Sequence, residues 1–239
     1  MTPDEISVVI PALNEAENIE RCVASAAAAG QVIVVDGGSD DATLQIAEAA
    51  GATVIRSPAG RAMQQNAGAK AATGKTLLFL HADNHLAPTA IHQVCDAMTQ
   101  HPERWWGALG QRIEAAGFAF RLLEHGNAWR VRWRGLPFGD QAIFVQRERF
   151  DEVGGFPDEP IMEDLILSQR LRRIGRPLLL PGPVYVDPRR WQQMGVLRQT
   201  FRNFGLQIAF ALGVSPQRLR SHYANHADSD SPSGRAAKR

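Results

Sequence analysis

The chain has 239 residues, enough for one sizeable domain or for a domain with a small appendage. Its two cysteines, Cys22 and Cys95, lie far apart, so neither a disulfide framework nor a cysteine zinc site is expected. The acidic amino terminus does not resemble a signal peptide, and no apolar run approaches the roughly 20 residues that span a bilayer. We therefore expect a cytoplasmic protein.

The net charge of +1 conceals an uneven distribution. Residues 1–103 hold 5 Lys+Arg against 12 Asp+Glu, whereas residues 104–222 hold 18 against 11. Nearly all of the basic residues in the second half are arginine, which suits oxyanions and headgroups. This half is expected either to face an acidic ligand or surface, or to form an ordinary solvated surface. We expect no nucleic-acid partner.

Strands and helices are predicted to alternate over the first hundred residues. Short apolar runs typical of buried parallel strands occur at 6–10, 32–35, 53–56 and 76–80, and Pro11 is expected to end the first. Helices are expected at 15–28, 41–50 and 60–72, and a further helix is expected to begin at Pro88. This order predicts an α/β fold with a mostly parallel central sheet flanked by helices, whose ligands bind beyond the carboxyl ends of the strands.

The second half is less regular. Strands are expected at 105–114 and 141–146, with two short strands within 178–186. Helices are expected at 118–134, 162–174 and 191–212. The polar tail over 223–239 is expected to be disordered.

Four short motifs occur in order along the chain. They are Ile10-Pro11-Ala12-Leu13-Asn14-Glu15, Val34-Val35-Asp36-Gly37-Gly38-Ser39-Asp40-Asp41, Leu80-His81-Ala82-Asp83 and Met162-Glu163-Asp164. Each is weak alone, but the ordered set resembles the family 2 glycosyltransferases of GT-A fold, over roughly residues 5 to 190. The resemblance implies an inverting transferase with a nucleoside-diphosphate sugar donor, a UDP- or GDP-sugar foremost, and a divalent cation, Mn²⁺ or Mg²⁺.

The resemblance also implies one domain over residues 1–222. Its nucleotide-binding part would reach to about residue 103, and its acceptor part would follow from about residue 104. The donor-binding residues that the motifs and their neighbours suggest are Pro11, Asn14, Glu15, Asp36, Arg61, Ala82 and Asp83. Asp36 matches the residue that contacts the nucleobase, although an Asp there also suits the following glycine turn. Arg61 fits the geometry of a phosphate, with an ordinary surface role as the alternative.

Asp83 matches the last carboxylate of the family's DxD motif, and is the expected metal ligand. His81 replaces the first carboxylate of that motif. One carboxylate together with a diphosphate can hold a hard divalent cation. His81 is either a second ligand, which Mn²⁺ tolerates better than Mg²⁺, or a packed polar residue at a strand end.

Asp164 is the expected general base, and Glu163 is the second candidate for a catalytic role. Asp164 shares helical spacing with Leu167, Leu171 and Ile174, which predicts that it faces the protein interior, whereas Glu163 falls on a more mixed face. For both carboxylates the alternative is a cap or dipole partner at a helix amino terminus.

Two further sets of residues follow from the resemblance. Asp140 and Gln141 are expected on the acceptor side, and Arg189, Arg190 and Trp191 are expected to close over the diphosphate. The QxxRW motif of processive polysaccharide synthases is not evident, which argues against a polymerising synthase.

Other enzyme classes fit the sequence less well. There is no GxGxxG after the first strand, and Gly74-Lys75-Thr76 lacks the first glycine of a P-loop. A nucleotidyltransferase usually carries a Gly-rich, Lys-containing loop after the first strand, which is absent. A non-catalytic nucleotide-binding protein is the remaining alternative, suggested by the missing DxD carboxylate.

The segment 118–134 combines aromatic and basic residues. Its apolar members are Phe118, Phe120, Leu122, Leu123, Trp129 and Trp133, and its basic members are Arg121, Arg130, Arg132 and Arg134. Such a mixture suits a membrane interface or a lipid-linked acceptor, so peripheral contact with the inner face of a membrane is one expectation. A helix packed in the core is the alternative. The sugar, the acceptor and the oligomeric state do not follow from the sequence.

Overall fold

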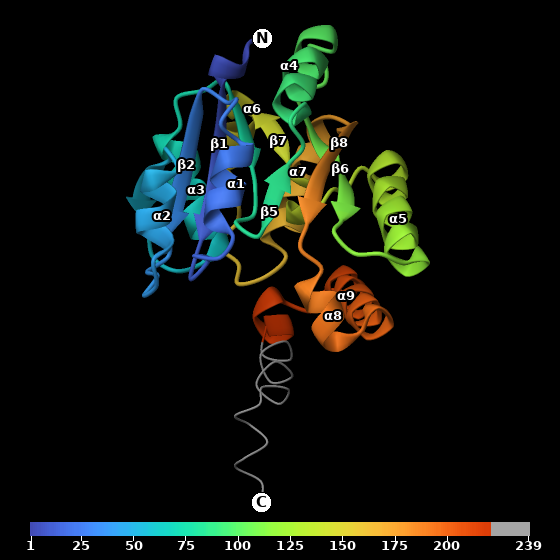
Figure 1. Ribbon diagram of the computed structural model, residues 1–239. Coiled ribbons are helices and arrows are strands. Elements are labelled where there is room, and N and C mark those ends of the chain that lie inside the picture. The colour runs from blue at the N-terminus through green and yellow to red at the C-terminus, as the bar shows by residue number, and fades with distance from the viewer. Residues whose placement is uncertain (221–239) are drawn as a thin grey trace, which may run out of the picture. The chain divides into compact units, whose positions relative to one another are not determined.

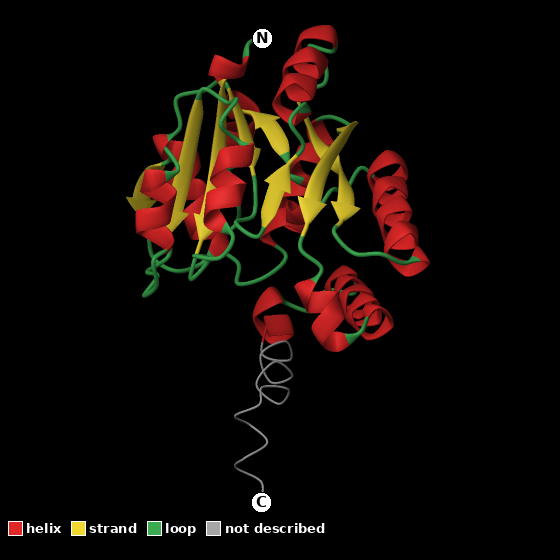
Figure 2. Cartoon of the chain, viewed as in Figure 1, coloured by secondary structure: helices red, strands yellow, loops and turns green. Residues whose placement is uncertain are grey.

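A computed structural model describes residues 1–220 of the chain (Figures 1 and 2). It divides into two compact units, which are considered separately. The first comprises Met1–Asp158 and Glu163–Pro188, and the second comprises Glu159–Met162 and the chain from Arg189 onward. The tail expected over 223–239 lies outside the described residues. Among those residues, no helix has the length and apolar character needed to cross a membrane.

A sheet of eight strands forms the centre of the first unit, within the described part of the chain. The strands are β1 (Ile6–Ala12), β2 (Gln31–Asp36), β3 (Thr53–Arg56), β4 (Thr76–Phe79), β5 (Asn84–Leu86), β6 (Trp106–Ile113), β7 (Phe144–Gln146) and β8 (Leu178–Val186). Their order is β3-β2-β1-β4-β7-β6-β8-β5. The first four in that order are parallel, β6 and β8 are parallel, and β7 and β5 run antiparallel to their neighbours. The expected α/β fold with a mostly parallel sheet is confirmed.

Helices cover both faces of this sheet, with α1 and α4 in front and α3, α6 and α7 behind in the view of Figure 1. Their bounds are α1 (Ile19–Ser25), α2 (Thr43–Ala49), α3 (Arg61–Ala71), α4 (Ala90–Gln100), α5 (Phe118–Arg134), α6 (Arg147–Glu152) and α7 (Glu163–Ile174). Two 3₁₀ turns are η1 (Pro3–Glu5) and η2 (Gly139–Gln141). The second unit contains α8 (Arg189–Met194) and α9 (Val196–Ala211).

Pro11 does not end the first strand, contrary to the sequence prediction. Strand β1 continues to Ala12, with Pro11 opposite Val35 of β2. Along a strand, the N–H and C=O groups of one residue point toward one neighbouring strand and those of the next residue toward the other. The carbonyl of Val9 accepts a hydrogen bond from Leu80, on the side of β4. The nitrogen of Pro11 therefore faces that side as well, and there the pairing with β4 has already ended. Since no ladder hydrogen bond is lost, the strand tolerates the proline.

Other boundaries also differ from those predicted. The helix expected from residue 15 begins only at Ile19, and the one expected from Pro88 begins at Ala90. The segment 178–186 is one strand with an irregularity rather than two, and the last helix is broken at Gly195, whose φ is 81°. Strand β5 and helix α6 were not predicted, because both are too short to leave a periodic pattern.

The packing of α3 fixes the ends of the two central strands. Gln64, almost fully buried on α3, donates hydrogen bonds of 2.8 Å from Nε2 to the carbonyl oxygens of both Ala12 and Val35. Gly68, one turn later, lies directly against the sheet. A Cβ atom there would meet Val9 Cγ1 and would lie 2.9 Å from Val35 Cγ2. The close approach of α3 to β1 and β2 therefore depends on glycine at this position.

We expect the substitution Gly68→Ala to destabilise the fold. Overpacking costs about 1–3 kcal/mol, against which the gain in helix propensity is about 1 kcal/mol. The free energy of unfolding, measured by urea denaturation, should therefore fall by up to about 2 kcal/mol. Gly126→Ala is the matched control, because Gly126 lies inside α5 with open space around its Cα. That variant should be neutral or slightly more stable, and equal losses in the two variants would contradict this packing.

Candidate functional site

The loops that follow β1 and β2 are tied together by side-chain hydrogen bonds. Asn14, whose φ is 54°, donates from its backbone N–H to Ser39 Oγ over 2.9 Å and accepts at Oδ1 from the N–H of Asp40 over 3.0 Å. The N–H of Glu15 donates to Thr43 Oγ1 over 2.8 Å. Asparagine is among the residues that adopt such a positive φ most readily. The rim at the carboxyl ends of these strands is thereby held in one conformation.

Asp36 ends β2 and is buried, with only 1% of its surface exposed. Its carboxylate accepts hydrogen bonds from the N–H groups of Gly38, at 3.0 Å, and Ser39, at 3.1 Å. The turn-stabilising role that the sequence left open is thus present. A carboxylate offers about four acceptor positions, so these bonds leave capacity for a further donor.

Arg61 at the start of α3 and Glu163 at the start of α7 form an ion pair. Arg61 Nη1 lies 3.2 Å from Glu163 Oε1; the arginine side chain is 44% exposed and that of the glutamate 3%. Burial raises the pKa of Glu163 and the neighbouring Asp164 raises it further, whereas Arg61 acts in the opposite direction. Burial lowers the pKa of Arg61, but the surrounding carboxylates, Glu163 foremost, raise it by more.

Asp164 is held by two backbone donors. Its Oδ2 accepts from the N–H of Gly139 at 2.7 Å, and its Oδ1 accepts from the N–H of Leu165 at 2.7 Å. Gly139 is enclosed so tightly that a Cβ atom would lie 2.7 Å from His81 Nε2 and 3.3 Å from Asp164 Oδ2. Three segments distant in sequence therefore meet here, namely the end of β4, the turn η2 and the start of α7.

Asp83 completes this group of carboxylates. It is half-buried just after β4, and among residues 1–220 its side chain has neither a hydrogen bond nor an ion pair. It lies within electrostatic reach of Arg61 and Asp140, since its charge raises the pKa of both. Within the described part of the chain, no three His, Cys, Asp or Glu side chains are arranged to hold a metal ion. A cation here would need oxygen atoms from a ligand as well as Asp83, which fits a diphosphate.

The acceptor-side candidates Asp140 and Gln141 lie in η2, beside the same group. Burial raises the pKa of Asp140, the charge of Arg130 opposes this, and Asp164 and Asp83 add to the rise. Gln141 is fully buried, and its Oε1 accepts from Arg130 Nη2 at 2.8 Å. Gln141 is therefore held in the interior, and Asp140 lies partly buried beside it.

Arg130 of α5 is a site residue that the sequence did not single out. Its Nε donates to the carbonyl of Leu136 at 3.0 Å, its Nη1 donates to Asn127 Oδ1 at 2.9 Å, and its guanidinium lies 3.6 Å from the centre of the Phe138 ring. Burial lowers its pKa to about 10. Because α5 joins η2 only in three dimensions, no local pattern in the sequence marks this arginine among its neighbours.

The structure thus brings most of the predicted residues to one edge of the sheet. The residues of this carboxylate cluster are Arg61, Asp83, Asp140, Glu163 and Asp164, with His81 beside them. Pro11, Asn14, Glu15, Asp36 and Ala82 occupy the adjoining strand ends of the same unit. Arg189, Arg190 and Trp191 begin α8 and belong to the second unit.

The helical face predicted for α7 was wrong in part. Glu163 is more deeply buried than Asp164, and Ile174, expected to face inward, is 44% exposed. The ion pair with Arg61 explains the burial of Glu163, because it supplies the counter-charge that a buried carboxylate requires. Asp164 is the member of the pair that remains half-exposed.

The family model described as Glycosyl transferase family 2 matches residues 7–156. The catalytic subunit of cellulose synthase 1 from Komagataeibacter xylinus, a UDP-forming enzyme, is 26% identical over 204 residues, 72% of this chain and 27% of that protein. An uncharacterized glycosyltransferase of Mycobacterium tuberculosis is 34% identical over 162 residues, 64% of this chain and 73% of the relative. The chain therefore spans about a quarter of the first relative's length and about three quarters of the second's.

Solved structures share the fold. TarS of S. aureus, residues 1–349 in complex with UDP-GlcNAc, has a TM-score of 0.61 at 17% identity, over 77% of this chain and 58% of that one. Glucosyl-3-phosphoglycerate synthase from Mycobacterium tuberculosis, in complex with Mg²⁺ and UDP, has a TM-score of 0.55 at 20% identity. The match covers 76% of this chain and 68% of the synthase chain. These likenesses confirm the GT-A-type fold that the motifs indicated.

The buried carboxyl of Asp140 predicts a pH dependence of stability. Burial raises the pKa of Asp140 in the folded state above its ordinary value of 3.8. As the pH rises from about 4, the folded protein therefore holds a proton that the unfolded chain has lost, and the free energy of unfolding falls. Asp140→Asn removes this fall. Urea denaturation should show the variant gaining stability relative to the parent between about pH 4 and about pH 7.

Asp151→Asn provides the control, because Asp151 is an exposed aspartate on α6. Its stability difference from the parent should not change over the same pH range. A pH-independent difference for Asp140→Asn, or one that moves in the opposite direction, would show that the buried carboxyl does not oppose folding.

Proposed function

Because the chain belongs to glycosyl transferase family 2, we propose that it moves a sugar from a nucleoside-diphosphate sugar to an acceptor hydroxyl, with inversion and with a divalent cation. The observation that carries the proposal is the carboxylate cluster around Arg61 at the carboxyl ends of the strands. Ligands of such sheets bind at this edge. A nucleotidyltransferase, the other enzyme class that shares this scaffold, has no comparable support from the family match.

The donor is proposed to be a UDP-sugar. TarS was solved with UDP-GlcNAc, the mycobacterial synthase was solved with UDP, and the cellulose synthase subunit is UDP-forming. In this chain, the spare acceptor capacity of Asp36 would receive an N–H of the base. Arg61 would face the diphosphate, since its guanidinium is partly exposed and already oriented by Glu163. That Arg189, Arg190 and Trp191 contact the diphosphate stays a prediction from the sequence.

Asp83 is proposed to hold the cation together with the donor's diphosphate, with His81 as a further candidate ligand. The half-buried carboxylate of Asp83 has acceptor capacity to spare among the described residues, which suits this role. The mycobacterial synthase has been solved with Mg²⁺ and with Mn²⁺ in the presence of UDP. Such an ion, when bound, offsets the negative charge that develops on the leaving diphosphate.

Asp164 is proposed as the general base. As the acceptor oxygen bonds to the anomeric carbon, the bond from that carbon to the diphosphate oxygen breaks, and Asp164 takes the hydroxyl proton. The two backbone donors that hold Asp164 fix its orientation, and its half-exposed position leaves it open to an acceptor. Glu163 is buried in its ion pair, so we assign it to positioning Arg61 rather than to proton transfer. Asp140 and Gln141 would border the acceptor.

Replacing Asp83 should remove the effect of metal on nucleotide binding. We expect Asp83→Ala to abolish the enhancement of UDP affinity by Mn²⁺, measured by titration calorimetry with and without the ion, while the melting temperature stays near that of the parent. The control is Asp96→Ala, an exposed aspartate on α4, which should retain the full enhancement. If Asp83→Ala kept a parental response to Mn²⁺, its assignment as the ligand would be wrong.

Asp164→Asn should impair turnover rather than donor binding. A general base contributes about 10²–10⁴-fold to rate, and the amide preserves the side chain's shape. With an acceptor identified by screening, UDP release should slow by at least about 100-fold, while calorimetry should give a parental affinity for UDP. Glu163→Gln is the comparison and should weaken donor binding more than it slows chemistry. Parental turnover in Asp164→Asn would refute the assignment of Asp164 as the general base, whereas a parent that binds UDP but transfers no sugar would favour a non-catalytic nucleotide-binding protein.

A further inference from the structure

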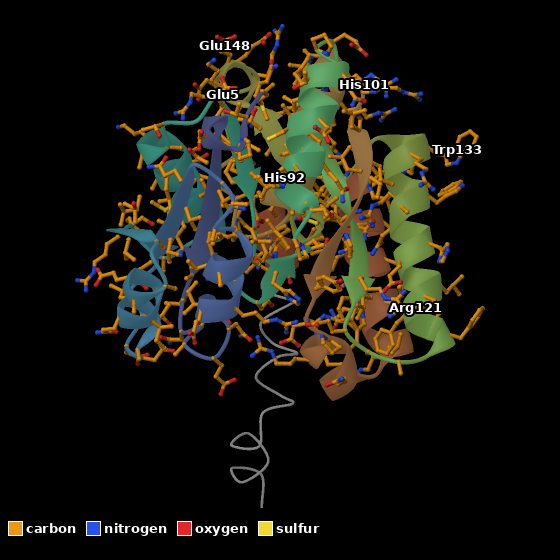
Figure 3. The ribbon with its side chains drawn as sticks, turned by 45° about the horizontal axis from the view of Figure 1, so that its top comes forward. Glu5, His92, His101, Arg121, Trp133 and Glu148 are labelled. Carbon is orange, nitrogen blue, oxygen red and sulfur yellow. The ribbon has the colours of Figure 1, made fainter. Side chains whose placement is uncertain are left out.

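Helix α5 carries large exposed apolar side chains along one face. Its members and their exposed fractions are Phe118 (81%), Leu122 (61%), Trp129 (58%) and Trp133 (68%). At 3.6 residues per turn, these four positions fall within an arc of roughly 60°. The rings of Trp129 and Trp133 lie 6.4 Å apart, and Figure 3 shows Trp133 projecting outward from the helix. We refer to these four residues as the α5 stripe.

The opposite face of α5 packs against the rest of the first unit. Phe120 and Val131 are buried, and Glu124 Oε1 accepts from the N–H of Ile113 on β6 at 2.6 Å. Arg121 Nη1 pairs with the same oxygen of Glu124 at 2.9 Å. The expectation of a core helix is therefore right for one face only. The α5 stripe is not part of that core, and exposing four large apolar side chains together calls for a partner.

The surroundings of the stripe are cationic. Arg132 and Arg134 are exposed on α5, and Arg112 is exposed on the adjacent strand β6. Glu124 is the helix's single acidic residue, and it is buried and paired with arginine. The exposed side of α5 therefore presents aromatic and basic groups without a carboxylate of its own.

This combination selects one kind of partner. A second copy docking symmetrically on the stripe would bring the same arginines together, and that repulsion opposes a dimer. An anionic bilayer offers the complementary charge, and indole rings suit the boundary between headgroups and acyl chains. We propose that α5 docks the protein on an anionic lipid bilayer, with the α5 stripe in the interface and the flanking arginines on the headgroup phosphates.

Vesicle sedimentation tests the proposal directly, using the full chain and the protein's own tryptophan fluorescence as a second readout. The parent should bind vesicles that contain phosphatidylglycerol and should bind pure phosphatidylcholine vesicles at least tenfold more weakly. Trp129→Ser/Trp133→Ser should reduce the partition coefficient at least tenfold. Arg132→Gln/Arg134→Gln should reduce it about fivefold per charge, because each arginine near an anionic surface contributes about 1 kcal/mol.

Ile174→Ser is the matched control, since Ile174 is a half-exposed apolar residue on α7 and lies outside the stripe. It should bind anionic vesicles like the parent. Failure of the parent to bind anionic vesicles at low salt would overturn the proposal, as would undiminished binding by the tryptophan variant. The proposal would also be overturned if sedimentation without lipid showed a dimer that Trp129→Ser/Trp133→Ser dissociates, because a second copy would then be the partner.

Discussion

The hydrogen bond from the N–H of Gly139 to Asp164 Oδ2 is the contact on which the proposed active site depends. It joins the turn η2 to the start of α7, and the same glycine lies against His81 at the end of β4. A side chain at Gly139 would require the imidazole of His81 to shift, because its Cβ would lie 2.7 Å from Nε2 and 3.3 Å from Asp164 Oδ2. The close approach therefore brings the proposed general base, the candidate metal ligands and the acceptor-side turn to one edge of the sheet.

Charge balance explains why this edge suits a phosphorylated ligand with a cation. Glu163, Asp164 and Asp83 lie within electrostatic reach of Arg61, and Asp140 lies within reach of Asp164 and Asp83. Burial and the neighbouring carboxylates raise the pKa of Glu163 and Asp140. Arg61 forms an ion pair with Glu163, and Arg130 donates hydrogen bonds to Leu136, Asn127 and Gln141. Asp83 is left without an ion pair in the described part of the chain. A divalent cation would relieve the repulsion, and it would also draw in a diphosphate.

The sequence predicted the parts of this arrangement that follow from strand ends. Buried apolar runs identified β1, β2 and β4, and parallel strands bring their carboxyl ends together, which places Asp36 and Asp83 correctly. The sequence could not predict partners that meet only in three dimensions. The burial of Glu163 depends on Arg61, about a hundred residues earlier, and the role of Arg130 depends on α5 packing beside η2. Helical spacing likewise could not show which face of α5 would be covered, because apolar side chains occur on both.

The most direct test of the account is a crystal structure of the protein with UDP and Mn²⁺, in which anomalous scattering locates the ion. We expect the ion on a carboxylate oxygen of Asp83 and on the diphosphate, with Arg61 against that diphosphate and the nucleobase near Asp36. We also expect Asp164 to keep its hydrogen bond to Gly139 and not to touch the ion. An ion bound by Asp164, or a nucleotide bound away from the ends of β1, β2 and β4, would contradict it.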